Sequence, residues 1–355
     1  QHLWPLWPYN QTMSEKRRAL IIGGTGTISL SVVKRLLSLD WEVWTINRGK
    51  RSDVLPPSVR QIHVDIKDEE AVKEAISSLH FDSVAEFVAY GRDDVERDRR
   101  LFMGKTEQYI FVSSASAYEK PPRSPFITEE TPLENPYWEY SRNKKECEEY
   151  LFSSFRNEGF PVTVVRPSHT YDDRKFPVAV HGALGSWSVV KRMIEKKKVL
   201  VPGDGSSLWT VTWCEDFAVG FAGIMGRKET LGEAYQITGS ETLTWNQILS
   251  TIASSVGGEY RPCYVPSSLL ASLGRRYGYD YEGELLGDKA NSVIFLCDKI
   301  RAAVPEMKTT VSFFMGAKRC AKRILSDPEL QKEDRDFDIF SDKVVEIMER
   351  MENEA

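Results

Sequence analysis

The sequence is poor in cysteine and histidine, and the few that it has are scattered. Five cysteines occur in 355 residues, and none stands in a Cys-x-x-Cys pair. This odd number and spacing argue against a disulfide framework and favour reduced thiols in a cytoplasmic protein. The five histidines are equally dispersed, without a His-Glu-x-x-His motif. We therefore expect no metal site.

Long apolar runs and an excess of basic charge are also missing. No stretch approaches the roughly 18 apolar residues that a membrane-spanning helix needs. The net charge of −5 provides no basic excess for nucleic acid, so neither a membrane nor a nucleic-acid partner is expected. With 41% hydrophobic and 28% charged residues, the composition is typical of a globular protein. The length suits one large α/β unit or two joined lobes.

The first twelve residues differ from the rest of the chain. They contain two Trp-Pro steps and no periodicity, and they lack the charged start and apolar stretch of a signal peptide. Met13-Ser14-Glu15 is typical of a natural start. We therefore interpret residues 1–13 as an extension and expect it to be disordered.

From residue 19 onward, short apolar runs alternate with segments of helical periodicity. This alternation is typical of βαβ units and predicts an α/β fold with a Rossmann-type, doubly wound parallel sheet. The expected strands are 19–22, 41–46, 59–64, 83–89, 108–113 and 161–166, and the expected helices are 26–39, 68–79 and 137–157.

Beyond Pro167 the alternation becomes looser. We expect helices at 186–197, 214–225 and 245–256 and a strand at 233–238, whereas 264–298 has only weak periodicity. The predicted organisation is a dinucleotide-binding core with the catalytic residues at 14–170, and a smaller C-terminal substrate-binding lobe at 171–330. This lobe is expected to be mixed, with elements that return to the core, and 331–355 is expected to be a helical tail.

A glycine-rich segment joins the first expected strand to the first helix. It reads Ile21-Ile22-Gly23-Gly24-Thr25-Gly26-Thr27-Ile28-Ser29. Glycines permit a tight turn there and let backbone N–H groups approach a pyrophosphate at the helix N-terminus. We therefore predict a dinucleotide site that includes Gly23, Thr25, Gly26, Thr27 and Ile28. Ser29 replaces the last glycine of the usual motif, which is a small change.

The end of the second expected strand bears on the choice of cofactor. It reads Asn47-Arg48-Gly49, without the acid that would bind the ribose 2′-hydroxyl of NAD. Because an arginine can pair with the 2′-phosphate of NADP, we expect NADP as the preferred cofactor and NAD as the alternative, with Asn47 and Arg48 in contact with it. Asp65 and Ile66 end the third strand and are expected to flank the adenine. For Arg48 and Asp65 the alternative is a plain turn.

Tyr140 and Lys144 form the expected reactive pair. They are four residues apart on a predicted helix and therefore share a face. A lysine cation beside a phenol favours the phenolate and lowers its pKa, so Tyr140 is expected to act as a general acid or base. Ser114 ends the fifth strand, where substrates of open α/β sheets bind, and its hydroxyl is expected to hold the substrate oxygen. A second match, from Tyr171 to Lys175, is interpreted as a loop.

Further landmarks follow in order along the chain. They are Val112-Ser113-Ser114 with Tyr118, Val165-Arg166-Pro167, Pro202-Gly203-Asp204-Gly205 and Asp298-Lys299-Ile300. With the glycine loop and the Tyr140 motif they resemble the extended (atypical) short-chain dehydrogenase/reductase superfamily, in its NAD-dependent epimerase/dehydratase-like branch, over residues 19–318. The resemblance implies that Ser114, Tyr140 and Lys144 are catalytic and that Lys144 also holds the nicotinamide ribose. It also implies cofactor contacts by Ala89, Pro167 and His169.

One departure from that branch concerns the substrate. Its sugar-nucleotide members usually carry an arginine after Gly-Asp-Gly, where this chain has Trp209. A tryptophan cannot clamp a diphosphate as a guanidinium does, so a smaller or more apolar substrate is expected. The expected substrate contacts are Ser116, Tyr118, His181, Trp187 and Trp209. For the tryptophans and the histidine, a purely structural role is the alternative.

Three functions remain open at this stage. The first is an NAD(P)-dependent oxidoreductase acting on a carbonyl or alcohol of a small, apolar molecule. The second is a redox-neutral epimerase, dehydratase or isomerase that retains its cofactor and acts on a sugar or natural-product intermediate. The third is a non-catalytic dinucleotide-sensing or RNA-binding Rossmann protein, which the intact Ser114, Tyr140 and Lys144 argue against. The helix that carries Tyr140 is our hypothesis for a homodimer surface.

Overall fold

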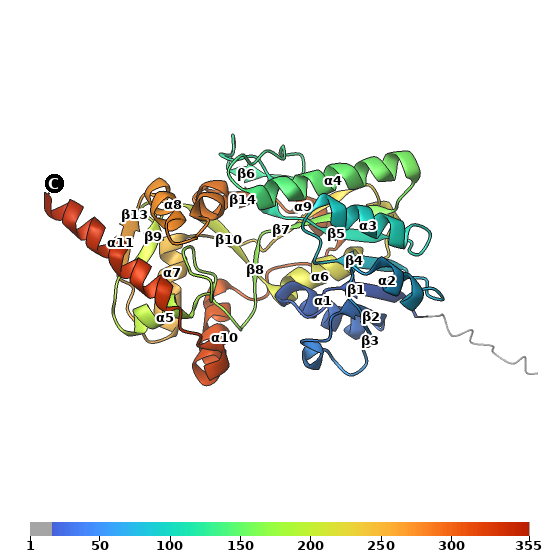
Figure 1. Cartoon of the computed structure of the whole chain (residues 1–355), viewed down its shortest axis with the longest axis horizontal. Helices are drawn as coiled ribbons and strands as arrows, with labels where there is room; N and C mark the ends of the chain where they lie inside the picture. Colours follow the sequence, from blue (N-terminus) through green and yellow to red (C-terminus); the bar gives the residue numbers. More distant parts are fainter. Residues whose placement is uncertain (1–15, 355) are drawn as a thin grey trace, which may run out of the picture.

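The computed structural model describes residues 16–354, and its largest element is a seven-stranded sheet (Figure 1). The expected extension at residues 1–13 lies outside the described residues. The strands follow one another in the order β11 (Ala234–Ile237), β7 (Val162–Pro167), β5 (Tyr109–Val112), β4 (Ser83–Glu86), β1 (Arg18–Ile22), β2 (Glu42–Asn47) and β3 (Arg60–His63). Every neighbouring pair is parallel, and the strand order reverses beside β1. The predicted doubly wound Rossmann-type sheet is thus confirmed.

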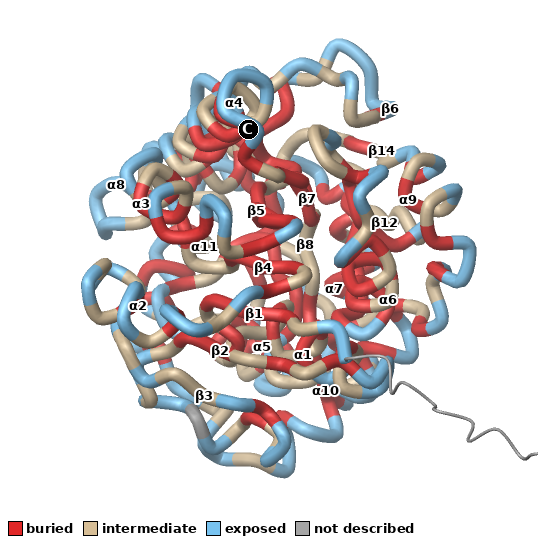
Figure 2. The backbone as a smooth tube through the Cα atoms, turned by 90° about the vertical axis from the view of Figure 1, so that its right-hand side faces the viewer, coloured by how far each residue is buried: buried red, intermediate tan, exposed pale blue. Residues whose placement is uncertain are grey.

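Helices cover both faces of this sheet. On one face lie α1 (Thr27–Ser38), α6 (Cys214–Ile224) and α9 (Asp298–Ala303), and on the other α2 (Glu69–Ala75), α3 (Arg92–Phe102) and α4 (Glu139–Glu158). Ala19 and Ile21 pack under α1, whereas the alternate residues Leu20 and Ile22 pack on the opposite face. Because side chains alternate along a strand, burial of both faces requires the continuous apolar runs of the sequence. Figure 2 shows β1, β4, β5 and β7 as buried strands at the centre of the molecule.

A second core lies in the C-terminal lobe, opposite the first strands in Figure 1. Its helices are α5 (Trp187–Ile194), α7 (Trp245–Ser255), α8 (Ser267–Arg275), α10 (Phe313–Ser326) and α11 (Arg335–Glu354). They surround two small sheets. One is formed by β8 (His169–Tyr171), β10 (Leu208–Trp213) and β12 (Thr242–Thr244), and the other by β9 (Val199–Pro202) and β13 (Pro262–Val265). A third small sheet pairs β6 (Phe126–Ile127) with β14 (Ile294–Phe295). Within residues 16–354, no helix has both the length and the apolar character needed to cross a membrane.

Several stretches differ from the elements that the sequence predicts: β10 and α10, for example, were not predicted, and three further differences lie in the Rossmann unit. The strand expected at 83–89 ends at Glu86, because the Glu86 carboxylate accepts a hydrogen bond from the Val88 N–H (2.5 Å) and turns the chain. The helix expected at 68–79 is shorter, since α2 begins after its N-cap Asp68 and ends at Ala75. Helix α3 was not predicted, because most of its residues are charged and it offers few apolar positions.

Candidate active site

The glycine-rich loop lies between β1 and α1, at the carboxyl edge of the sheet. Gly23 has a φ of 81°, and a Cβ at this position would overlap Val88 Cγ1. A Cβ at Gly24 would lie 2.8 Å from Thr45 Cγ2. Only glycine therefore permits this turn. The resulting cradle at the N-terminus of α1 fits the pyrophosphate of a dinucleotide.

Ser29, which replaces the last glycine of the usual motif, fastens this loop. Its hydroxyl donates a hydrogen bond to the Gly23 carbonyl oxygen (2.7 Å) and accepts one from the Gly26 N–H (3.0 Å). Ser29 itself is buried. The departure from the glycine motif thus keeps the turn closed through side-chain bonds.

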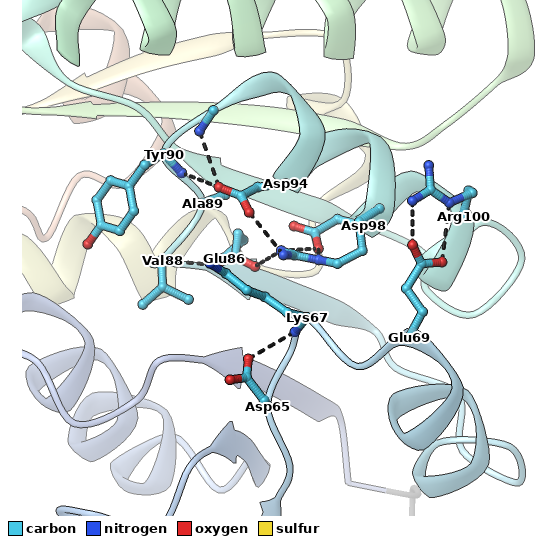
Figure 3. A network of polar contacts seen from close by, with 12 residues as sticks. Asp65, Lys67, Glu69, Glu86, Val88, Ala89, Tyr90, Asp94, Asp98 and Arg100 are labelled. Carbon is cyan, nitrogen blue, oxygen red and sulfur yellow. Dashed lines mark hydrogen bonds and ion pairs between the residues drawn. The ribbon is translucent and has the colours of Figure 1, made fainter. Parts of the chain in front are cut away.

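The residues expected around the adenosine lie at the same sheet edge, because β2 and β3 run parallel to β1. Asn47 Oδ1 accepts a hydrogen bond from the Gly49 N–H (2.8 Å), which shapes the turn around Arg48. Arg48 is exposed and forms no ion pair within the described residues. Asp65 is also exposed and accepts from the Lys67 N–H (3.0 Å; Figure 3), while Ile66 is half-buried.

A cavity of about 250 Å³ opens at the carboxyl ends of β5 and β7. It is lined by Ser114, Ala115, Ser116, Trp138, Tyr140, Pro167, Ser168, His169, Trp209, Asp288 and Phe295. The structure thus brings six of the expected site residues together around one space, and it adds Asp288 from the C-terminal lobe. Trp209 forms part of the wall, stacked on Trp245 with ring centroids 5.6 Å apart.

Lys144 lies behind Tyr140 but does not touch its hydroxyl. The Lys144 ammonium donates hydrogen bonds to the carbonyl oxygens of Ala89 (2.7 Å) and Val112 (2.9 Å), and it lies 5.6 Å from the centroid of the Tyr140 ring. Burial lowers the pKa of Lys144 to about 8. Burial also raises the pKa of Tyr140 to about 12, although a hydrogen bond with Ser114 opposes this rise. The expected lowering of the tyrosine pKa is therefore corrected: at neutral pH Tyr140 is a neutral phenol that can donate a proton.

Three serines form a hydrogen-bonded chain beside Tyr140. Ser141 Oγ donates to Ser116 Oγ (2.7 Å), which lies 2.8 Å from Ser114 Oγ. Since Ser116 accepts from Ser141, its own hydroxyl proton is directed to Ser114. Ser114 also accepts from the Ser116 N–H (3.1 Å), so its hydroxyl proton points to the Tyr140 oxygen or to a substrate oxygen in the cavity.

Three of the expected substrate contacts do not line this cavity. Tyr118 is fully buried, and its hydroxyl donates to Gln236 Oε1 (3.0 Å). The His181 ring lies 3.8 Å from the Glu284 carboxylate in the C-terminal lobe, and Trp187 packs against that lobe's core. The lining residue His169 does reach the cavity, and burial lowers its pKa well below the usual value, so its imidazole is neutral there.

A buried charge network lies beneath the turn that follows β4 (Figure 3). Arg97 is the cation next to three carboxyl groups. It donates hydrogen bonds to Asp94 (3.0 Å) and Asp98 (2.8 Å) and lies 3.8 Å from Glu86. The Tyr109 hydroxyl also donates to Asp98 (2.6 Å). Burial and the neighbouring Asp98 raise the pKa of Glu86 well above its usual value.

This network fixes the turn that holds Lys144. Glu86 accepts from the Val88 N–H, and Asp94 Oδ2 accepts from the N–H groups of Tyr90 (2.9 Å) and Gly91 (3.2 Å; Figure 3). Between them lies Ala89, whose carbonyl oxygen binds Lys144. Ala89, expected as a cofactor contact, is thus fully buried and positions the lysine.

Sequence reasoning missed Asp288, the one carboxylate that lines the cavity. Asp288 belongs to a π-helix, η4 (Glu282–Lys289), within the stretch that showed weak periodicity. Burial raises the pKa of its carboxyl group to about 6. No motif surrounds it, and only the packing of η4 against the Rossmann unit brings it to the site.

Comparisons with known proteins agree with this fold. The model of the NAD-dependent epimerase/dehydratase family matches residues 19–238. A 2′-dehydrokanamycin reductase from Streptomyces kanamyceticus is 21% identical over 257 residues, which are 72% of this chain and 71% of that protein. The chloroplast stem-loop binding protein of 41 kDa b from Arabidopsis thaliana is 25% identical over 257 residues, 69% of this chain and 64% of that protein.

Solved structures share the same architecture. An epimerase from Methanothermobacter thermautotrophicus superposes with a TM-score of 0.71 at 16% identity, covering 89% of this chain and 94% of its own. The dTDP-glucose 4,6-dehydratase from Bacillus anthracis, in complex with NAD, gives 0.69 at 18% identity, with 88% and 98% covered. At these identities the likeness shows the fold alone.

Proposed function

This chain belongs to the NAD-dependent epimerase/dehydratase family, and we propose that it is an NADP-preferring oxidoreductase that interconverts a carbonyl and an alcohol of a small molecule. One observation carries the proposal: Ser114 and Tyr140 line one cavity, with Lys144 directly behind the tyrosine and the glycine loop at the same sheet edge.

The residues of the cavity supply the acid chemistry of a reduction. A bound nicotinamide supplies the hydride. Ser114 donates a hydrogen bond to the substrate oxygen and holds it against Tyr140. The neutral phenol of Tyr140 gives its proton to that oxygen as the carbonyl carbon accepts the hydride. Lys144 keeps a positive charge near the ring and so stabilises the phenolate that Tyr140 becomes.

Steady-state turnover is the direct test of this proposal. The purified chain is incubated with NADPH and a panel of small ketones and aldehydes, and the absorbance of the reduced cofactor is followed. Net consumption of NADPH supports the oxidoreductase. Dinucleotide binding without turnover of any carbonyl, or of any alcohol with NADP⁺, would support a non-catalytic protein instead.

A redox-neutral epimerase or dehydratase is the second candidate, and Asp288 is the observation in its favour. A carboxyl group with a pKa near 6 in the same cavity as Tyr140 offers a second acid–base group for elimination or epimerisation. Such an enzyme would form product while its extracted dinucleotide stays bound and unconsumed.

The proposed NADP preference rests on Arg48, which is exposed at the end of β2. Replacing it in an Arg48→Glu variant is expected to weaken NADPH binding about tenfold to hundredfold, because the phosphate loses a cation and meets an anion. NADH binding should be retained. Fluorescence titration with each cofactor measures both affinities. Arg156→Glu, the same charge change on the exposed last turn of α4, is the control, and equal NADPH loss in both variants would contradict the assignment.

The rate of reduction is expected to fall above about pH 8. Because burial lowers the pKa of Lys144 to about 8, its charge is present below this pH and is lost above it. Tyr140, whose pKa lies near 12, stays protonated over the same range. Profiles of kcat/KM between about pH 6 and 10 measure the effect. A rate that stays level to about pH 10 would show that the charge of Lys144 does not assist the reaction.

A further inference from the structure

Asp288 faces the cavity with its carboxylate available for a ligand. Its nearest cation is the buried Lys120, whose ammonium lies 3.9 Å away, beyond hydrogen-bonding distance. The Asp288 side chain accepts no hydrogen bond from any residue that the structure describes. The Asp288 side chain is 17% exposed, so water or a ligand in the cavity has to supply the donors for its oxygens. The cavity therefore presents an acceptor that its own walls leave unmatched.

The position of Asp288 is fixed relative to the reactive residues. The Asn135 side-chain amide donates to the carbonyl oxygens of both Ser116 (2.7 Å) and Gly287 (2.7 Å), and so joins the segment that carries Ser116 to η4. Gly287 packs on Trp138, where a Cβ would lie only 3.1 Å from the tryptophan Cβ. This arrangement preorganises the carboxylate.

The remaining walls show which chemistry the cavity accepts. Apart from Asp288 and the indole N–H groups of the tryptophans, its polar side chains are three serine hydroxyls, the Tyr140 phenol and the neutral imidazole of His169, and no lysine or arginine lines the described cavity. A phosphate or carboxylate would meet one anion and no cation there. Trp138, Trp209 and Phe295 provide apolar surface against which a ring can lie.

We propose that Asp288 recognises the substrate and that this substrate is a small, unphosphorylated ring bearing hydroxyl or ammonium groups. The carboxylate accepts hydrogen bonds from these donors, while Ser114 and Tyr140 hold the oxygen of the reacting carbon. The volume of about 250 Å³ accommodates a single ring. This inference rests on the proposed function, since it assigns the substrate class of the same cavity.

Calorimetric titration of the cofactor-loaded full chain tests this assignment without requiring turnover. The probes are glucose, galactose, mannose, their 2-amino counterparts and UDP-glucose. At least one free sugar is expected to bind, and Asp288→Asn should weaken it about tenfold or more through loss of charge-assisted hydrogen bonds. A preference for the amino sugar that weakens with salt identifies an ammonium donor, and equal binding of both identifies hydroxyl donors.

Glu284→Gln is the matched control, because Glu284 also lies on η4 but pairs with Lys289 (3.0 Å) and does not line the cavity. It should bind the sugar as the wild type does. Unchanged NADPH affinity shows that each variant is folded, and Asp288→Ser replaces Asp288→Asn if the latter does not fold.

The inference is overturned if UDP-glucose binds more tightly than every free sugar, if none of the free sugars binds, or if both Asp288 variants bind like the wild type. Failure of the proposed function looks different. Sugar binding that depends on Asp288, in a protein that transfers no hydride in either direction, would refute the oxidoreductase and leave the recognition role standing.

Discussion

Replacing Tyr140 by phenylalanine is expected to lower kcat for carbonyl reduction about a thousandfold, because the variant has no proton to give the substrate oxygen. The phenol is positioned to serve as this acid, since it lines the cavity and hydrogen-bonds with Ser114. The loss should appear in kcat more than in KM, because the proton moves in the transition state. Stopped-flow measurement of NADPH oxidation in a single turnover isolates this step.

The matched control is Tyr137→Phe, which removes the hydroxyl of a partly exposed tyrosine just before α4 that does not line the cavity. This variant should react like the wild type. Both variants should also bind NADPH with wild-type affinity. A Tyr140→Phe variant that keeps most of its single-turnover rate would show that another group donates the proton, and Ser114, at the end of the serine chain, would be the next to replace.

Much of the Rossmann unit can be predicted because local pattern and global packing agree in it. A strand such as β1 is apolar throughout because both of its faces are buried, and the helix that follows shows one apolar stripe. The glycine loop is equally clear, since Gly23 has to adopt a positive φ where Val88 approaches. Helix α3 could not be predicted from such an apolar pattern. Its Arg97 and Asp98 are buried, yet charged residues in a sequence predict exposure.

The site was predictable where a local sequence motif marks its residues, as at Ser114, Tyr140 and Trp209. The spacing of Tyr140 and Lys144 indicates a shared helix face, but it contains no information on the two carbonyl oxygens that hold the lysine. Tyr118 was among the expected substrate contacts, whereas the chain turns its ring inward to Gln236. Asp288 comes from a distant segment, and tertiary packing alone brings it to the cavity.

The largest effect on stability is expected at Arg97. An Arg97→Met variant should lower the free energy of unfolding by about 3–5 kcal/mol near pH 7, because it leaves buried carboxylates without their cation. Asp98 is fully buried, and Arg97 is almost so. Urea unfolding followed by tryptophan fluorescence measures the change. Arg100 is on the same helix as Arg97 and forms an exposed ion pair with Glu69 of α2; Arg100→Met is the control and should stay close to wild type.

The deficit of this variant should shrink as the pH falls. Without the guanidinium, the folded-state pKa values of Asp98 and Glu86 rise further above their unfolded values, so the folded state binds protons more readily than the unfolded state. Its free energy of unfolding therefore increases on acidification from about pH 7 toward pH 5. A deficit that is the same at both pH values would show that lost packing around the arginine stem, and not unpaired charge, destabilises the variant.

The same variant connects the network to the active site. Glu86 and Asp94 hold the turn that carries Ala89 (Figure 3). The Ala89 carbonyl oxygen in turn accepts a hydrogen bond from Lys144. If the turn relaxes when Arg97 is removed, Lys144 loses one of its two acceptors, and kcat should fall under conditions where the protein remains folded. Full activity of folded Arg97→Met would instead mean that the Val112 carbonyl oxygen alone positions the lysine, and the buried charges would then serve stability only.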